Sequence, residues 1–398
     1  MGRNIIQVDP AKFPWLDLRR YTFCMGVEKN GVAYLSGNTG SEFDKEKGRV
    51  LVKGDIGEQS KIAWEKIAVV LEAAGMSLSD VVKTVDYITP AGLALYKKTG
   101  DVRRQFIGNT PVASTGVVVH SLLRPEAHIE IQVVAAKGAK QALNPGGPDY
   151  AKYANLTYAP GVKVGDKIWL SGVTQPSAQD DTATQEEKAY KHIESTLKAG
   201  GATFDDVVNV FEFTAPQAIL THKDAKNKMR DRFFKKNKPA SSNVVVHRLI
   251  SADAHIEIDA TAVVGGGRQE VMIPDWEKTC KEMRSVPAVK KGNMLYISSQ
   301  ASIDYATGKT VADDHDLGSQ SRRAYKNLAL ICSKAGISMD DIAYTLEFTP
   351  PMVAEQVRKL QEVRKEAFGS SFPAATGIIP HRLLDSDQIF SVVAVALV

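Results

Sequence analysis

Side chains that can accept and donate protons recur at three matching places along this 398-residue chain. The histidines stand in the similar segments VVVHSLL, VVVHRLI and IIPHRLL, and they are His120, His247 and His381. Acids occupy matching positions in VDYITP, FEFTAP and LEFTPP, and they are Asp86, Glu212 and Glu347. A carboxylate beside an imidazole can orient a general base whose unperturbed pKa lies near neutrality. The spacing therefore predicts histidine–carboxylate pairs, with all six residues as candidate catalytic groups.

The apolar residues on either side of each acid predict which way the acid points. They are Val85 and Tyr87, Phe211 and Phe213, and Leu346 and Phe348. Because successive side chains of a strand face opposite sides, we expect these neighbours to face helices and the acids to face inward. A buried carboxylate is costly unless it is paired, so the histidine is its expected partner.

These positions belong to one sequence unit that occurs three times. SLSDVVKTVDYITP, TFDDVVNVFEFTAP and SMDDIAYTLEFTPP are versions of one element, and their central aspartates lie 126 and 135 residues apart. Glycine-rich segments, one of them NPGGP, separate the copies and are typical of linkers. We expect three units, at residues 1–138, 139–267 and 268–398.

Within a unit the periodicity indicates strands, a helix, a strand, a charged helix and two closing strands. Gly75, Gly201 and Gly336 follow the first helices, where a left-handed backbone costs glycine little. Two helices can cover only one face of a sheet, so the other face needs the remaining copies. We expect an α+β pseudo-threefold trimer within one chain, sheets inward and helices outward.

For the repeated histidines and acids, two alternatives to catalysis remain. They could form a structural link, or they could hold a metal on the pseudo-threefold axis, and no metal ligand is assigned.

The motif order SG, helix, EAAG, DVV, F-x-x-x-x-P and IEI resembles the Rid (YjgF-type) family of reactive-intermediate deaminases, three times over. The resemblance implies chorismate-mutase-like units with binding clefts between neighbours. Family members act as homotrimers, and many hydrolyse enamines or imines to ketones and ammonia.

Two family features are altered here. Typical deaminase members hold the substrate carboxylate with an arginine, and the matching positions are Ser114, Ser241 and Ala375, of which the two serines are candidate substrate-binding residues. The family glutamate of the IEI strand, near the leaving nitrogen, is matched by Glu130 and Glu257, whereas the third unit has Phe390. We therefore expect the three clefts to differ and ligand to occupy fewer than three.

The expected function is a cofactor-free hydrolase of a small organic molecule at a C–N bond, either an imine or enamine deaminase or an enzyme acting on an amide-like group. A histidine would activate water, and a cleft glutamate would donate the proton. One alternative is hydrolysis of a cyclic amide or ether, as in cyanuric-acid hydrolases and chorismatases. Another is a non-catalytic small-molecule-binding protein.

The composition and the motif search limit the classes of partner and cofactor that we expect for this chain. The net charge of +4 is too small for this length to indicate nucleic acid or membrane. No apolar run has the length of a membrane span, and three distant cysteines imply no disulfide framework. GxGxxG, Walker, HExxH and CxxC motifs are absent. We expect a cytoplasmic protein without cofactor or metal, present as a monomer or dimer.

Overall fold

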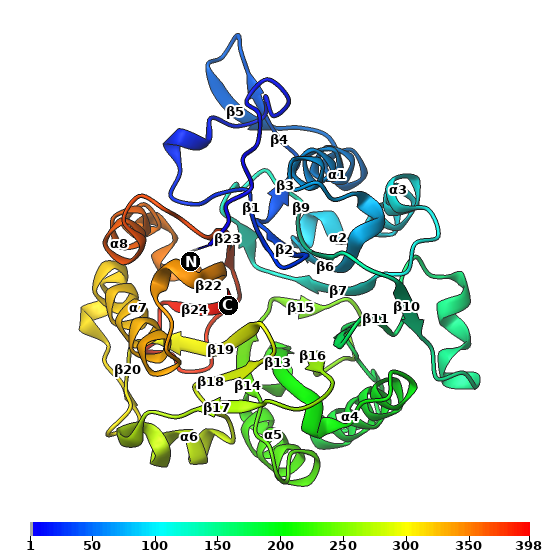
Figure 1. The fold of residues 1–398 in the computed structure, drawn as a ribbon, viewed down its shortest axis with the longest axis vertical. Coiled ribbons are helices and arrows are strands. Elements are labelled where there is room, and N and C mark those ends of the chain that lie inside the picture. The colour runs from blue at the N-terminus through cyan, green and yellow to red at the C-terminus, as the bar shows by residue number, and fades with distance from the viewer. Residues whose placement is uncertain (1–2) are drawn as a thin grey trace.

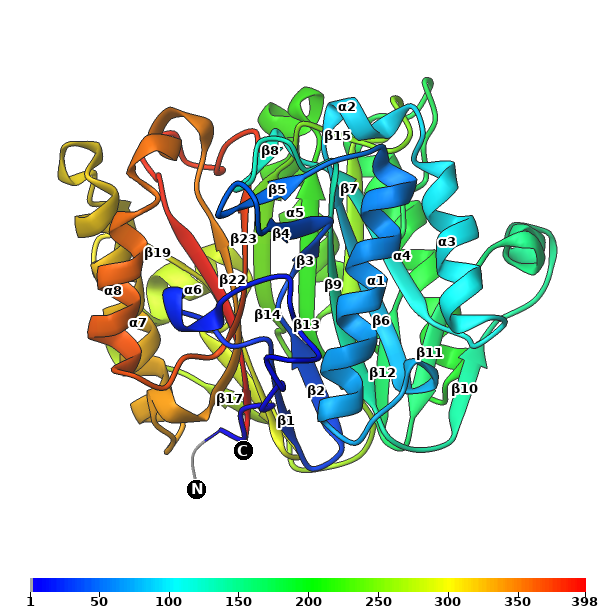
Figure 2. The ribbon, with the colours of Figure 1, turned by 90° about the horizontal axis from the view of Figure 1, so that it is seen from above.

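The computed structural model describes residues 3–398 and shows three sheets around a common centre, with the long helices outside (Figures 1 and 2). The first sheet has the order β1 (Gly26–Lys29), β2 (Val32–Leu35), β9 (Ile129–Ala136), β6 (Val81–Ile88), β7 (Ala113–Val118) and β15 (Arg248–Leu249), with β3 (Asn38–Thr39) also on β9. Its helices are α1 (Ile56–Ala73), α2 (Pro90–Leu93) and α3 (Lys97–Ile107).

The other two sheets repeat this plan. The second has the order β10 (Lys140–Leu143), β11 (Gly161–Val164), β12 (Lys167–Leu170), β16 (Ile256–Val263), β13 (Val207–Thr214) and β14 (Ala240–Val245), with helices α4 (Thr182–Ala199) and α5 (Ile219–Phe233). The third has the order β17 (Gln269–Val271), β18 (Ala288–Lys291), β19 (Met294–Ala301), β24 (Ser391–Leu397), β22 (Ile342–Phe348), β23 (Ala374–Ile379) and β8 (Ser121–Leu122), with helices α6 (Glu277–Met283), α7 (Leu317–Lys334) and α8 (Lys359–Phe368). Two small hairpins pair β4 (Ser41–Asp44) with β5 (Arg49–Val52) and β20 (Ile303–Asp304) with β21 (Lys309–Thr310). The expected α+β fold, with sheets inward and helices outward, is confirmed.

Local sequence explains where the first long helix of each unit begins and ends. In α1, Asp55 accepts hydrogen bonds from the backbone N–H groups of Gly57 and Glu58, and the Glu58 side chain accepts from the Asp55 N–H. This capping box satisfies donors that the first helical turn leaves free. Beyond the helix, Gly75 has a φ of 62°, a conformation that side chains with a Cβ rarely adopt.

The inner faces of the three sheets pack on one another and form one shared apolar core. Side chains of all three units contribute, and two aromatic contacts cross between units: Tyr34 to Tyr344 and Phe211 to Phe348, each with ring centroids 5.8 Å apart. A separate apolar core lies between each sheet and its own helices. Both faces of every sheet are therefore buried, so a charged residue of a strand needs a buried partner on whichever face it occupies.

Short segments pass from each unit to its neighbour and close the ring. β15 of the second unit pairs with β7 of the first, and β8 of the first pairs with β23 of the third. A bridge between Val245 and Arg382 joins the third unit to the second. Each unit thus both gives and receives one such segment within a single chain.

Because the ring closes internally, we expect a monomer of 43.3 kDa, or a dimer through outer surfaces, in sedimentation velocity. A homotrimer in which each chain gives one unit to a shared ring would contradict this topology. Within residues 3–398, no helix combines the length and apolar character needed to cross a bilayer.

Candidate functional site

A serine clamp marks each of the three interfaces between units. Ser36 Oγ donates to the carbonyl of Cys24 at 2.6 Å and accepts from the N–H of Ala375 in the third unit at 2.8 Å. Ser171 and Ser298 accept in the same way from the N–H groups of Ser114 and Ser241, both at 2.8 Å. The positions matched to the family arginine therefore lie at the interfaces. We call these interfaces the 3–1, 1–2 and 2–3 clefts, after the units that meet there.

The serine side chains at two of those positions turn toward other polar groups. Ser114 is buried, and its Oγ accepts from Thr84 Oγ1 at 3.1 Å. Ser241 Oγ accepts from Arg230 at 3.1 Å and borders the 2–3 cleft. Substrate binding by Ser114 and Ser241 stays a prediction.

The repeated acids do not pair with the repeated histidines, so that prediction is wrong. Each acid faces the helices of its own unit and is buried against an arginine and a tyrosine. The pairs are Asp86 with Arg103 at 2.8 Å, Glu212 with Arg230 at 2.7 Å, and Glu347 with Arg364. The tyrosine hydroxyls that donate to these acids belong to Tyr96, Tyr190 and Tyr325.

The acids point in the opposite direction to the prediction because their apolar neighbours pack in the core shared by the units. Val85 and Tyr87 lie in that core, which leaves Asp86 on the helix side of β6. In the second unit, burial alone would raise the pKa of Glu212, but the adjacent Arg230 guanidinium lowers it to about 2. The acid is an ionised, structural partner of the arginine.

The three histidines gather on the surface where the crossing segments meet. The ring centroids are 6.3 Å apart for His120 and His247, and 6.4 Å for His247 and His381. Each backbone N–H donates to a carbonyl of the neighbouring unit: His120 to Ile379, His247 to Val118 and His381 to Val245. All three side chains are exposed. Burial and then His120 lower the pKa of His247.

This cluster is separate from the clefts described below, which other residues line. Among the residues that the structure describes, no three histidine, cysteine or acidic side chains are placed to hold a metal ion. A catalytic role for His120, His247 and His381 stays a prediction, without the carboxylate partner that motivated it.

Glu130 and Glu257 occupy equivalent positions and face the space between units. Glu130 pairs with Tyr87 across β9 and β6, and Glu257 with Phe213 across β16 and β13. Burial raises the pKa of both to about 8, against the opposing effect of Arg124 and Lys66 at Glu130. Each is therefore an uncharged carboxylic acid at neutral pH, able to donate a proton.

In the third unit the position equivalent to these glutamates is Ser391, which corrects the match to Phe390. Ser391 pairs with Phe348 across β24 and β22, in the register that Glu130 and Glu257 have in their sheets. Phe390 instead lies in the helix-side core, with its ring centroid 6.0 Å from that of Tyr325. The third unit therefore carries no acid at this position. Counting from the preceding histidine places Glu130, Glu257 and Ser391 at the same interval.

Each glutamate side chain has room only because the residue packed against it is a glycine. A Cβ on Gly37 would lie 1.9 Å from Glu130 Oε1, and one on Gly172 would lie 2.0 Å from Glu257 Oε1. The third unit has Ser299 at this place, and its hydroxyl forms a short hydrogen bond with that of Ser391. Glycine with glutamate, or serine with serine, are thus the two combinations that fit the same space.

We expect Gly37→Ser to destabilise the protein by about 1–3 kcal/mol, because overpacking a filled site costs that much. Adding Glu130→Ser, which copies the third unit, removes the clash and restores much of the loss. Urea unfolding of both single variants and the double variant measures the coupling. Additive effects of the two substitutions would show that the residues do not compete for space.

The 3–1 cleft is open and carries charge. Its cavity of about 640 Å³ is bordered by Glu130, Lys66 and Arg124 of the first unit and by Arg358 of the third. Arg124 donates to the hydroxyl of Tyr21 at 3.0 Å. Within the described chain, neither Arg124 nor Arg358 forms an ion pair with a carboxylate, so both guanidinium groups are available to an anionic ligand.

Lys66 is a residue of this cleft that the sequence reasoning missed. It is buried, and its ammonium donates to the carbonyls of Thr39 and Ser41 and to Ser41 Oγ at 3.0 Å. Burial, with Arg124 second, lowers its pKa to about 7. Through these three hydrogen bonds Lys66 holds the segment from β3 to β4 in place beside Glu130. The signal that could have identified Lys66 is a lysine within the apolar repeat of α1.

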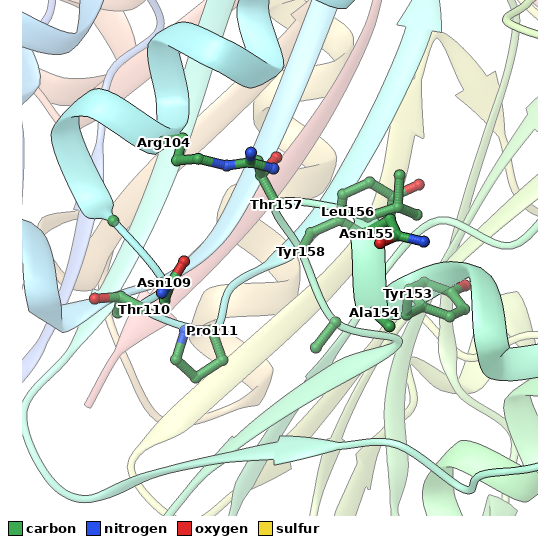
Figure 3. A pocket seen from close by; sticks show the side chains of 12 residues that line it. Arg104, Asn109, Thr110, Pro111, Tyr153, Ala154, Asn155, Leu156, Thr157 and Tyr158 are labelled. Atoms are coloured by element: carbon green, nitrogen blue, oxygen red, sulfur yellow. The ribbon is translucent and has the colours of Figure 1, made fainter.

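The linker between the first two units makes hydrogen bonds with the first unit at the 1–2 cleft. Thr157 Oγ1 accepts from Arg103 at 3.4 Å, and Ala159 N–H donates to the carbonyl of Val112 at 2.9 Å. Burial and then Glu257 raise the pKa of Tyr158. Figure 3 shows the linker opposite the end of α3, bordering a cavity of about 540 Å³. Glu257 is not among the residues that line this cavity.

The fold and these clefts define a protein of three fused Rid-type units. The sequence pattern of the family described as Endoribonuclease L-PSP matches residues 18–137, 150–264 and 281–398, and the chain belongs to this family. The resemblance to the Rid (YjgF-type) family, in three tandem copies, is confirmed.

Single-unit relatives match one part of the chain. A RutC family protein of Pyrococcus horikoshii is 33% identical over 109 residues, which cover 27% of this chain and 82% of that protein. The RutC family protein YjgH of Escherichia coli is 28% identical over 92 residues, covering 22% of this chain and 64% of that protein. Among solved structures, a chorismatase aligns with a TM-score of 0.54 and 14% identity over 80% of this chain and 93% of that chain. This last likeness concerns the fold.

Proposed function

We propose that the protein hydrolyses the C–N bond of a small imine or enamine in the 3–1 cleft, without a cofactor. The observation that carries this proposal is Glu130, an acid with a pKa of about 8 in an open cleft between units. A general acid works best when its pKa lies near the operating pH. The 2–3 cleft has Ser391 in place of the acid, and Glu257 does not line the cavity at the 1–2 cleft.

The proposed reaction needs only water and one proton-carrying group. The Glu130 carboxylic acid donates its proton to the imine nitrogen while water adds to the carbon, and the resulting carboxylate takes up the proton that this water releases. Glu130 then protonates the amino group of the tetrahedral intermediate. The C–N bond of the intermediate breaks as the C=O bond forms, and the Glu130 carboxylate takes up the proton of the hydroxyl group, so an imine and water give a ketone and ammonia and the acid is regenerated. An enamine enters the same sequence after protonation at carbon.

Arg124 and Arg358 support a substrate that carries a negative charge. They come from different units and border the cleft that holds Glu130. Guanidinium groups bind carboxylates in a planar, bidentate manner. We propose that they replace the family arginine, whose matched positions are serine or alanine here.

Ammonia release over a panel of imines generated in situ tests the proposal, with cyclic amides and an enol ether as alternative substrates. We expect release from carboxylate-bearing imines, and an increase in KM of at least tenfold for Arg124→Met with these substrates. Amide hydrolysis without imine hydrolysis would overturn the proposed reaction. Absence of turnover across the whole panel would favour a binding protein.

A further inference from the structure

The 2–3 cleft has lost the hydrolytic group but remains open. Ser391 stands in place of the glutamate, and its hydroxyl is bonded to Ser299. The cavity nevertheless measures about 470 Å³, within the range typical of small-molecule sites. An open cavity without the acid is suited to binding rather than to the proposed hydrolysis.

The two walls of this cavity carry opposite charge. Lys223 and Lys226 of α5 border it from the second unit, and Glu282 and Asp385 border it from the third. Among the described residues, none of these four side chains forms an ion pair, although Asp385 accepts a short hydrogen bond from Thr310. These four charged groups thus have no ionic partner within the described chain, although the Asp385 carboxylate also accepts from the backbone N–H of Asp387.

Lys226 is the most enclosed of the four. Burial lowers its pKa, and the carboxyl of Glu212 opposes this effect. An ammonium that is largely withdrawn from water gains more from a bound anion than an exposed one does. On the same wall His222 donates its Nδ1 proton to Glu186 at 2.8 Å and accepts from Asn243 at Nε2 at 2.7 Å, so this imidazole is already engaged.

The equivalent position in the 3–1 cleft has the reverse charge. Asp385 stands four residues after His381, and Arg124 stands four residues after His120 in the first unit. The loop that presents a guanidinium in the 3–1 cleft thus presents a carboxylate in the 2–3 cleft. The two open clefts therefore differ in the charge of the ligand group that this loop would meet.

We propose that the 2–3 cleft binds, without hydrolysing it, a small zwitterion that carries both a carboxylate and an ammonium group. Lys226 and Lys223 hold the carboxylate, and Asp385 and Glu282 hold the ammonium. Thr279, Ser285 and Ser299 also line the cavity, although the hydroxyl of Thr279 already donates to the carbonyl of Tyr305 and that of Ser299 is bonded to Ser391. This binding does not depend on the reaction proposed for the 3–1 cleft.

Isothermal titration of the full chain with glycine, L-alanine, L-serine and L-threonine tests this proposal. Propanoate, which lacks the ammonium, and ethylamine, which lacks the carboxylate, are the matched controls. We expect at least one amino acid to bind at one site per chain, at least tenfold more tightly than either control. Equal binding of propanoate, or no binding by any of the four amino acids, would overturn the proposal.

Variants then locate the site. Lys226→Met and Asp385→Asn are each expected to weaken amino-acid binding at least tenfold, whereas Lys228→Met, an exposed lysine of the same helix, leaves it unchanged. Circular dichroism checks that each variant keeps its fold. Glu130→Gln in the 3–1 cleft is expected to leave this binding intact, so loss of hydrolysis and loss of binding can be told apart. Binding that disappears in Glu130→Gln but persists in Lys226→Met would place the ligand in the 3–1 cleft and overturn the proposal.

Discussion

Glu130→Gln is expected to lower the rate of ammonia release by about 10²–10⁴-fold, the usual contribution of a positioned general acid or base. The amide has nearly the shape of the protonated acid but cannot release its proton to the imine nitrogen. The change should therefore appear mainly in kcat, measured by continuous ammonia detection on the best imine of the panel.

Glu257→Gln is the matched control for this substitution. Glu257 has the same strand position and a pKa raised to about 8, but it lies in the 1–2 cleft and does not line the cavity there. We expect it to change the rate less than twofold. If Glu257→Gln abolished turnover and Glu130→Gln did not, the reaction would have to be moved to the 1–2 cleft.

The pH dependence of the same reaction follows from the raised pKa of Glu130. The proton-donating form predominates below the pKa of about 8 and is lost as the pH rises through that value. Activity limited by this acid should therefore fall about tenfold per pH unit above pH 8. Residual activity of Glu130→Gln should lack this break. A wild-type rate that stays level to pH 10 would show that Glu130 is not the proton donor.

Arg230→Met is expected to destabilise the protein by about 3–5 kcal/mol, because it leaves the buried carboxylate of Glu212 without its partner. Both side chains are almost completely buried and are joined at 2.7 Å. Methionine keeps the apolar stem of the arginine but is shorter, so the uncompensated charge and some lost packing both contribute. Urea unfolding at pH 7 measures the effect.

Two comparisons separate the charge effect from packing. Arg232→Met, on the same helix as Arg230, removes a partly exposed ion pair with Glu187 of α4 and should cost less than about 1 kcal/mol. The double variant Arg230→Met with Glu212→Gln should recover part of the loss, since no buried charge remains. A loss below 1 kcal/mol for Arg230→Met would contradict a structural role for the pair.

The repeat, the secondary structure and the acid Glu130 could be predicted from the sequence because each depends on residues near one another in the chain. The helix periodicity, the glycines that follow each first helix and the spacing of the three copies are local patterns. The closing strand carried Glu130 and Glu257 in a recognisable motif. In the third copy, matching the isoleucines alone shifted the assignment from Ser391 to Phe390; the interval from the preceding histidine and the strand register both give Ser391.

The direction of the acids was decided by tertiary structure. Alternation along β6 showed that Asp86 faces away from Val85 and Tyr87, but both faces of this sheet are buried and apolar. Which face receives the acid depends on Arg103, 17 residues away on α3, which supplies the compensating charge. A strand pattern contains no information about that partner.

The family, the three-unit architecture and the presence of two acids suited to proton transfer could all be predicted from the sequence alone. The differences between the three clefts arise only in the folded chain. The linker between two units borders the cavity at one cleft, a serine pair replaces the acid in another, and arginines from two units border the third. Each of these features joins residues from different units, because a cleft forms only where two units meet.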